Sequence, residues 1–214
     1  MNPNTERILE KIKAELPRYE EPQRIEHTLG VLGECRFFAG FFRLDEEEER
    51  ALLTAALLHD LAKSVPEDEE PALFARYGIA GADATPPVRH QFLGAPMAKE
   101  AFGEEIVSDA VVSAIGCHTT GKPGMSRLDK MLFVADFTEA GRKYRSCTEM
   151  REYLHSKCAK LNANDASAKE RLLNDVVKRI LGYTITYLVE KGKDVDIETV
   201  LTWNDLIRQE KGDS

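Results

Sequence analysis

Apolar residues recur at spacings of three and four along most of the chain, and few runs alternate between apolar and polar with a period of two. A spacing of three and four places apolar side chains on one face of an α-helix. The pattern therefore predicts an all-α fold. Helices are expected over residues 4–16, from near Pro22 to before Leu44, and over residues 46–63, 104–118 and 126–138.

Proline, glycine and acidic residues indicate where these helices begin and end. Pro17 stops the first helix, and the run DEEEE before the third is typical of a solvated helix N-terminus. The stretch from Pro66 to Pro87, rich in proline and glycine, predicts a loop. A helix capped by Thr85 is expected to start at Pro86 and to be interrupted by Pro96. Residues 148–214 predict a pair of helices and a short terminal one.

Length and composition are those of one soluble domain. With 214 residues, 43% of them hydrophobic, the chain is expected to form a single domain over residues 1–214, in which helices at about 148–207 pack on a core of about 18–145. The net charge of −8 argues against a general nucleic-acid or membrane surface. No membrane span, secretory signal or CxxC pair is visible, so a cytoplasmic protein is expected.

Two strong metal ligands, His59 and Asp60, stand side by side in the apolar run AALLHDLAK. An ionised Asp in such a helix is costly to desolvate unless a metal or another partner compensates its charge. Imidazole and carboxylate together suit zinc, iron or manganese. The chain offers four further candidate ligands: His27, His90, His118 and Asp136.

A structural role is the alternative for each histidine taken alone, since most histidines are core or surface residues rather than ligands. Taken together, however, the candidates would leave a purely structural core with several buried charges to explain. Adjacent residues face different sides of a helix, so His59 and Asp60 can share an ion only if it lies over the end of their helix. His155 lies outside this constellation.

Three basic residues stand near the candidate ligands. Arg24 and Lys63 lie within about one helical turn of His27 and of the His-Asp pair, and Arg142 follows Asp136 beyond Gly141. Each alone is more often a solvated surface charge. Three cations around a metal site in an acidic protein nevertheless favour a phosphate pocket.

The order of these histidines and aspartates resembles the HD-domain superfamily of metal-dependent phosphohydrolases, which are all-helical. The segments RIEHTLGV, LLHDLAK, HTTGKPGMSRLDKMLFVADFTEAGR and TITYLVEKGK are similar to its YqeK branch, over about residues 5–207. Members of that branch hydrolyse diadenosine tetraphosphate symmetrically to two ADP. The resemblance implies an HD-domain helical bundle in which water activated by a metal attacks an inner phosphorus.

The resemblance also implies roles for particular residues. An iron-like divalent ion, with manganese or another divalent ion as alternatives, is expected on His27, His59, Asp60 and Asp136. Asp60, Lys63, His90 and His118 are the expected catalytic residues, and a second ion on Asp60, His90 and His118 stays an alternative. The residues expected at the dinucleoside polyphosphate or ADP-like nucleotide are Arg24, His27, Asp60, Lys63, His90, His118, Thr119, Thr120, Asp136 and Arg142.

Two features leave alternatives open. The run HQFLGAPMAKEAFG and residues 80–87 depart from the pattern of the branch, so Phe92 and Pro96 are expected to affect substrate fit rather than metal binding. A phosphohydrolase acting on another nucleotide or phosphate ester, a nucleotide-sensing module with little turnover, and a metal-free interaction domain are the alternatives. The C-terminal helices either pair two subunits in a homodimer or cap the core.

Overall fold

The computed structural model describes residues 2–212, and within that range the chain forms ten α-helices, two short 3-10 helices and no β-strand. The expected all-α fold is confirmed. No helix in the described part of the chain is both long and apolar enough to cross a bilayer. The helices are α1 (Pro3–Glu15), α2 (Pro22–Phe42), α3 (Glu46–Leu58), α4 (Glu70–Tyr77), α5 (Arg89–Phe102), α6 (Asp109–Ile115), α7 (Arg127–Thr138), α8 (Arg145–Cys158), α9 (Ala166–Glu190) and α10 (Ile197–Gly212), with η1 (Leu16–Arg18) and η2 (Pro86–Val88) between them.

Helix α3 lies at the centre of the fold and packs against α1, α2, α5, α6 and α7. All residues from Ala51 to Leu58 are buried, as expected of a helix with neighbours on every side. A capping box fixes its start: the Asp45 side chain accepts hydrogen bonds from two backbone N–H groups of the first turn, and the Glu48 carboxylate accepts from the Asp45 backbone N–H. The burial of Leu57, Leu58 and His59 holds the C-terminal end of α3 inside the molecule.

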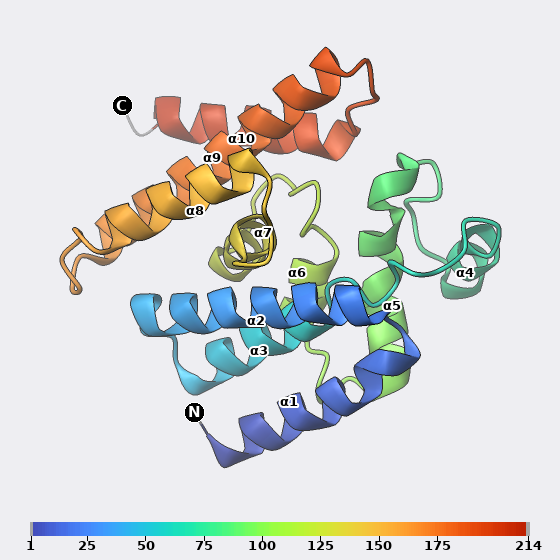
Figure 1. Cartoon of the computed structure of the whole chain (residues 1–214). Helices are drawn as coiled ribbons and strands as arrows, with labels where there is room; N and C mark the ends of the chain where they lie inside the picture. Colours follow the sequence, from blue (N-terminus) through green and yellow to red (C-terminus); the bar gives the residue numbers. More distant parts are fainter. Residues whose placement is uncertain (1, 213–214) are drawn as a thin grey trace.

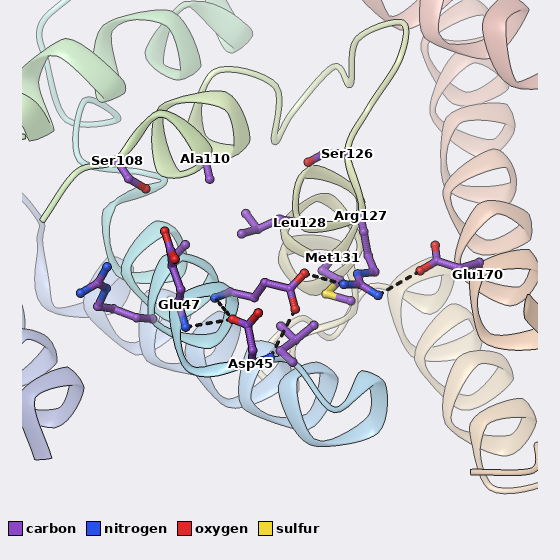
Figure 2. A pocket seen from close by; sticks show the side chains of 13 residues that line it. Asp45, Glu47, Ser108, Ala110, Ser126, Arg127, Leu128, Met131 and Glu170 are labelled. Atoms are coloured by element: carbon purple, nitrogen blue, oxygen red, sulfur yellow. Dashed lines mark hydrogen bonds and ion pairs between the residues drawn. The ribbon is translucent and has the colours of Figure 1, made fainter. Parts of the chain in front are cut away.

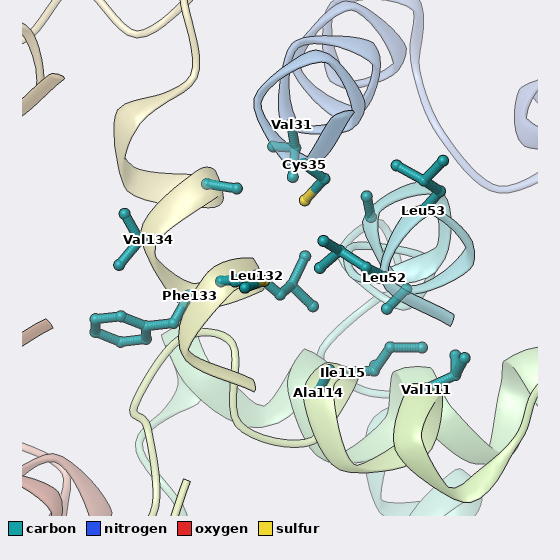
Figure 3. Packing of buried hydrophobic residues seen from close by; sticks show 14 of the residues in the cluster. Val31, Cys35, Leu52, Leu53, Val111, Ala114, Ile115, Leu132, Phe133 and Val134 are labelled. Atoms are coloured by element: carbon teal, nitrogen blue, oxygen red, sulfur yellow. The ribbon is translucent and has the colours of Figure 1, made fainter. Parts of the chain in front are cut away.

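Helix α7 joins the α2–α3 layer to the C-terminal helices, and Figure 1 shows it nearly end-on between them. It packs against α2, α3 and α6 on one side and against α8 and α9 on the other. In Figure 3, Leu132 of α7 points towards Leu52 and Ile115, whereas Phe133 points away from them. Packing on both faces fixes the position of Asp136 near the end of α7.

The third helix is shorter than expected, because α3 ends at Leu58 and not at Lys63. From His59 to Ser64 the chain continues in tight turns, in which the N–H of Leu61 donates to the carbonyl of Leu58 and the N–H of Lys63 donates to that of Asp60. The His-Asp pair thus stands at the helix end, the one place where adjacent residues can share a site.

The region expected to be a loop contains a helix, α4, and that expectation was wrong. Pro71 occupies the first turn of α4 and Gly78, with φ of 62°, caps its C-terminus. Both residues are typical of helix ends as well as of loops, which explains the error. Helix α5 also continues through Pro96, although proline costs it one backbone hydrogen bond. Burial of Leu93, Ala95 and Ala98 on either side offsets that loss.

Two other helices differ in length from the prediction. The helix predicted over residues 104–118 is limited to Asp109–Ile115, and α10 is longer than the short terminal helix expected.

Candidate functional site

Five parts of the chain meet around Asp60. The first turns of α2, the turns after α3, the start of α5, the turns after α6, and the end of α7 with the loop that follows all contribute side chains. The candidate residues whose side chains meet there, in the order of these parts, are Arg24 and His27; His59, Asp60 and Lys63; His90; His118 and Thr119; Asp136 and Arg142.

Two histidines and two carboxylates form the first group of potential ligands. The Nε2 atom of His27 lies 3.0 Å from Oδ1 of Asp136 and 3.3 Å from Nε2 of His59. Oδ2 of Asp60 is 3.8 Å from Nε2 of His27 and 3.6 Å from Nε2 of His59. His59 is fully buried, and the Asp60 side chain is 5% exposed. The donor atoms of His27, His59 and Asp60 therefore form one tight group, and Oδ1 of Asp136 adjoins it at 3.0 Å from His27 and 3.9 Å from His59.

The other oxygen of Asp60 faces a second group. Oδ1 of Asp60 is 3.3 Å from Nε2 of His90 and 3.6 Å from Nε2 of His118, and these two nitrogens are 3.1 Å apart. The three ligand atoms of this group lie within 4.8 Å of one another, as do those of His27, His59 and Asp60. Asp60 is thus shared between the two groups, one oxygen to each.

Backbone carbonyls fix how two of the rings present their nitrogens. Nδ1 of His59 lies 2.8 Å from the carbonyl oxygen of Ala56, and Nδ1 of His118 lies 2.8 Å from that of Ile115. A carbonyl only accepts, so each Nδ1 carries the proton and each Nε2 keeps its lone pair. Both lone pairs belong to nitrogens beside Asp60. This arrangement is typical of histidines that bind metal ions.

The charges of the site favour ionised carboxylates and neutral inner histidines. Burial alone would raise the pKa of Asp60, but the nearby imidazoles, His59 foremost, hold it well below its ordinary range. Burial lowers the pKa of His59 and of His90 to about 4. His27 differs, since burial would lower its pKa but the carboxylates of Asp136 and Glu139 raise it to about 9. His59 and His90 are therefore uncharged near neutrality.

Three cations surround the cluster, as the sequence predicted. Arg24 Nη1 lies 2.9 Å from Oδ2 of Asp60, and the Arg142 guanidinium pairs with Oδ1 of Asp136 at 2.5 Å. The ammonium of Lys63 lies 3.1 Å from Nδ1 of His90, and burial lowers the pKa of Lys63. Each cation is close enough to the ligand group to contact an anion held there.

Two cavities open on either side of these cations and share Arg24, Lys63 and Arg142 in their linings. The inner cavity, of about 400 Å³, is lined by Asp60, His90, His118, Asp136 and the apolar side chains of α7 and α9. The outer cavity, of about 870 Å³, is lined by His27 and by the segment from Glu139 to Tyr144. The ligand cluster therefore borders two cavities, and the same three basic side chains line both of them.

Glu139 belongs to this site although the sequence did not single it out. Its Oε1 lies 3.3 Å from Nδ1 of His27, and its Oε2 accepts a hydrogen bond from the backbone N–H of Gly141. Burial would raise the pKa of Glu139, but His27 and the Gly141 N–H lower it. The available signal was a carboxylate one turn beyond Asp136 at the end of an apolar helix.

Gln91 also escaped notice, and it positions the segment after His118. Its Oε1 accepts hydrogen bonds from the backbone N–H groups of Thr119 and Thr120, at 3.1 and 3.2 Å. Its amide nitrogen donates to the Thr120 hydroxyl, which itself donates to the carbonyl of Gly121. Thr120 is thus buried behind the cavities and lines neither, while Thr119 lines the inner one.

The atypical segment at 80–97 contributes Pro87, His90 and Gln91 to the site, and not Phe92 or Pro96. The carbonyl of Pro87 accepts a hydrogen bond from Lys63 at 3.3 Å, and His90 and Gln91 act as described above. Phe92 instead contacts Gly81 and packs in a small cluster with Phe74. Neither Phe92 nor Pro96 lines either cavity.

A further cavity, of about 480 Å³, lies away from the cluster at the N-terminal ends of α3 and α7 (Figure 2). Among its charged groups, Arg127 pairs with Glu48 and Glu170, and Asp45 caps α3. Nothing in its lining resembles the grouped ligands around Asp60.

The donor set around Asp60 fits a divalent ion. It combines imidazole nitrogens with carboxylate oxygens, the combination that iron, manganese and zinc accept. It also brings the buried carboxylate of Asp60 and the largely buried carboxylate of Asp136 to the same imidazoles, an arrangement that is costly unless cations compensate their charge. Such an ion would hold phosphate oxygens within reach of the three basic side chains, which is an arrangement suited to phosphoryl transfer.

Comparison with known proteins agrees with this geometry. The family model of the HD domain matches residues 24–141. The symmetrical bis(5'-nucleosyl)-tetraphosphatase of Bacillus subtilis is 29% identical over 206 residues, which are 95% of this chain and 98% of that protein. The enzyme of the same name from Halalkalibacterium halodurans is 28% identical over 97% of this chain and all of the relative. A predicted HD superfamily hydrolase involved in NAD metabolism from Clostridium acetobutylicum superposes with a TM-score of 0.74 at 28% identity, covering 94% of this chain and 97% of that structure.

Proposed function

The chain belongs to the HD domain family, and on that basis we propose that it is a metal-dependent phosphohydrolase that cleaves diadenosine tetraphosphate symmetrically to two ADP. The observation that carries the proposal is the convergence of His27, His59, Asp60 and Asp136 beside three cations. The two relatives named symmetrical bis(5'-nucleosyl)-tetraphosphatase align over almost the full length of this chain.

In this proposal, His27, His59, Asp60 and Asp136 hold the ion. When bound, a divalent ion supplies Lewis acidity to a phosphoryl oxygen and lowers the pKa of water. The Nδ1–H group of His59 keeps donating to the Ala56 carbonyl, so the ring keeps its orientation. Glu139 orients His27 in the same way from the opposite side of the ring.

The remaining polar residues act on the phosphate chain. Arg24, Lys63 and Arg142 bind its oxygens and oppose the negative charge that develops as the central bridging bond breaks. His90 and His118 face Oδ1 of Asp60 and contact the phosphate on that side. His90 is the proposed proton donor to the leaving oxygen, because Nε2 of His118 keeps a lone pair and the Lys63 ammonium lies on Nδ1 of His90. A second ion on Asp60, His90 and His118 is the competing arrangement, and the metal content per chain distinguishes the two.

We further propose iron as the ion and the cytoplasm as the location. The proposed ligands supply two imidazole nitrogens and two carboxylate oxygens, a set that suits ferrous iron and also manganese. Four buried, unpaired cysteines at positions 35, 117, 147 and 158 agree with a reducing compartment. Metal analysis of protein purified without oxygen tests the first statement.

Product analysis tests the activity itself. We expect protein supplied with ferrous or manganous ion to convert diadenosine tetraphosphate to ADP alone, as measured by anion-exchange chromatography. AMP and ATP in equal amounts would contradict attack at the central linkage. Faster turnover of guanosine polyphosphates, deoxynucleotides or phosphate monoesters would replace the proposed substrate, and nucleotide binding without turnover would favour the sensing alternative.

The contact between Gly30 and Glu139 yields a second prediction. A Cβ atom at Gly30 would overlap Oε2 of Glu139 and would lie 3.1 Å from its carboxyl carbon. We expect Gly30→Ala to push this carboxylate away from His27 and to lower metal affinity by about 10- to 100-fold, the usual effect of losing such a supporting contact. Titration of the metal-free protein with manganese, followed by calorimetry, measures the change.

Gly33→Ala is the matched control, because it lies one turn further along α2 with nothing within 4 Å of the added Cβ. It is expected to keep metal affinity and to gain up to about 1 kcal/mol of stability from helix propensity. Glu139→Gln should weaken metal binding as Gly30→Ala does. Unchanged affinity in both site variants would show that Glu139 does not support His27.

A homodimer formed through the C-terminal helices is a separate proposal. Tyr183, Tyr187 and Val189 of α9, with Ile197 and Leu201 of α10, are exposed apolar side chains on these helices. Light scattering coupled to gel filtration measures the mass, and a mass of one chain at micromolar concentration would reject the dimer.

A further inference from the structure

The outer cavity contains an aromatic side chain that the proposed chemistry does not use. Tyr144 lines this cavity, and it is 73% exposed, more than any other large apolar residue that the structure describes at the surface. Within residues 2–212 no ring or cation stacks on Tyr144, and its hydroxyl forms no hydrogen bond. Both faces of the ring are therefore free to contact a ligand.

The backbone beneath this ring is firmly held. Tyr144 is the N-cap of α8, and its carbonyl accepts hydrogen bonds from the N–H groups of Cys147 and Thr148, both at 3.0 Å. Arg151 of α8 donates to the carbonyl of Glu139 at 2.6 Å and ties the preceding loop to the same helix. The exposed ring thus projects from a fixed base, as a stacking platform requires.

The two cavities and the cations between them match the two halves of a symmetrical substrate. A dinucleoside tetraphosphate carries a nucleoside at each end of one phosphate chain. Arg24, Lys63 and Arg142 line both cavities, so a phosphate chain bound to them can extend into each. The inner cavity offers Phe133, Phe137 and Ile180 to one nucleoside.

The outer cavity has different walls. Apart from the imidazole of His27, Tyr144 is the one aromatic ring in its lining among the described residues, and charged or polar side chains form most of the rest. Tyr144 is therefore the exposed aromatic side chain on which a nucleobase entering this cavity can stack. Aromatic side chains bind bases of any identity through their faces.

We propose that the outer cavity binds the second nucleoside of the substrate, with its base stacked on Tyr144, and that this contact makes the enzyme prefer dinucleoside over mononucleoside polyphosphates. The inference rests on the proposed function, because it takes the dinucleoside tetraphosphate as the ligand. It assigns to Tyr144 a contact that distinguishes substrates and takes no part in breaking the phosphate bond.

Binding of two analogues tests the inference without any turnover. One is diadenosine tetraphosphate with a methylene group in place of the central bridging oxygen, and the other is adenosine 5'-tetraphosphate with the same replacement. Calorimetry on metal-loaded protein gives both dissociation constants for the wild type and each variant. We expect Tyr144→Ala to weaken the dinucleoside analogue about tenfold and to leave the mononucleoside analogue within twofold.

Two further variants separate stacking from other effects. Tyr144→Phe keeps the ring and should bind both analogues as the wild type does. Tyr187→Ala removes the same type of side chain from α9. Tyr187 is 41% exposed and lies outside both cavities, so its loss should change neither constant. The unchanged affinity for the mononucleoside analogue also verifies that Tyr144→Ala is folded.

Three results would overturn the inference: a wild type that binds both analogues equally, a Tyr144→Ala variant that weakens both alike, or a Tyr144→Phe variant that loses as much as the alanine. The fate of the proposed function is read separately, from cleavage of the natural dinucleotide. Protein that cleaves it but binds both analogues equally loses only the role of Tyr144. Protein that binds the dinucleoside analogue through Tyr144 without cleaving the natural compound loses only the proposed activity.

Discussion

Replacing Asp60 by Asn is expected to remove the bound metal and to abolish hydrolysis. Asp60 contributes one oxygen to each of the two histidine groups, so the change affects both at once. The amide has nearly the same shape but no charge, and its NH₂ group would face lone pairs of ring nitrogens. We expect at least a roughly hundredfold loss of metal affinity, beyond the usual loss from a supporting residue. Metal content and ADP release, measured on the same preparation, report the result.

Asp109→Asn provides the control, because it makes the same substitution on a fully exposed side chain at the start of α6. It should keep both the metal and the activity. Asp60→Asn protein that retained a full complement of metal and turned over normally would remove Asp60 from the centre of the site. Retained metal with no turnover would instead place the role of Asp60 in the reaction rather than in binding.

Much of the fold follows from periodicity, because a helix buried on one side has apolar residues at spacings of three and four. The first two helices and α7 lie close to the expected ranges. Helix α4 was missed because Pro71 and Gly78, which begin and end it, are also the residues of loops. Helix α3 was overextended because Leu61 and Ala62 continue the apolar pattern, although the chain has already entered tight turns.

The site residues likewise divide into those that the sequence pattern identified and those that it did not. The histidines and aspartates could be recognised because charged or polar residues in apolar runs require an explanation. Glu139 and Gln91 gave no comparable signal, since an acidic residue at a helix end and a glutamine beside a histidine are both common at surfaces. Their roles depend on contacts across the fold, to His27 and to the backbone of Thr119. No local pattern encodes such contacts.

Tyr144 shows a further limit. Its exposure and its place in the lining of the outer cavity depend on where the fold puts the start of α8, and neither is visible in the run GRKYRSC. The same limit applies to the cavities themselves, because each is formed by segments more than a hundred residues apart in sequence, from Arg24 to Arg142 and beyond. Sequence predicts which chemical groups are available, whereas packing decides which of them share a space.

Replacing Lys63 by Ala is expected to slow hydrolysis by about 10²- to 10³-fold while the protein keeps its metal. Removal of one group that stabilises developing charge typically has an effect of this size. Lys63 lies 3.1 Å from Nδ1 of His90, and burial lowers the pKa of His90 to about 4, so Lys63 supplies the positive charge on that side. Metal analysis and single-turnover kinetics of the variant measure the two properties.

The division of the loss between kcat and KM decides what Lys63 does. If its ammonium acts on charge that appears only as the bond breaks, kcat falls and KM stays nearly constant. If it holds the phosphate equally in the bound and reacting states, KM rises and kcat is kept. Lys99→Ala, which removes a surface lysine from α5, should change neither constant. Loss of metal from Lys63→Ala would show instead that this lysine supports the ion site.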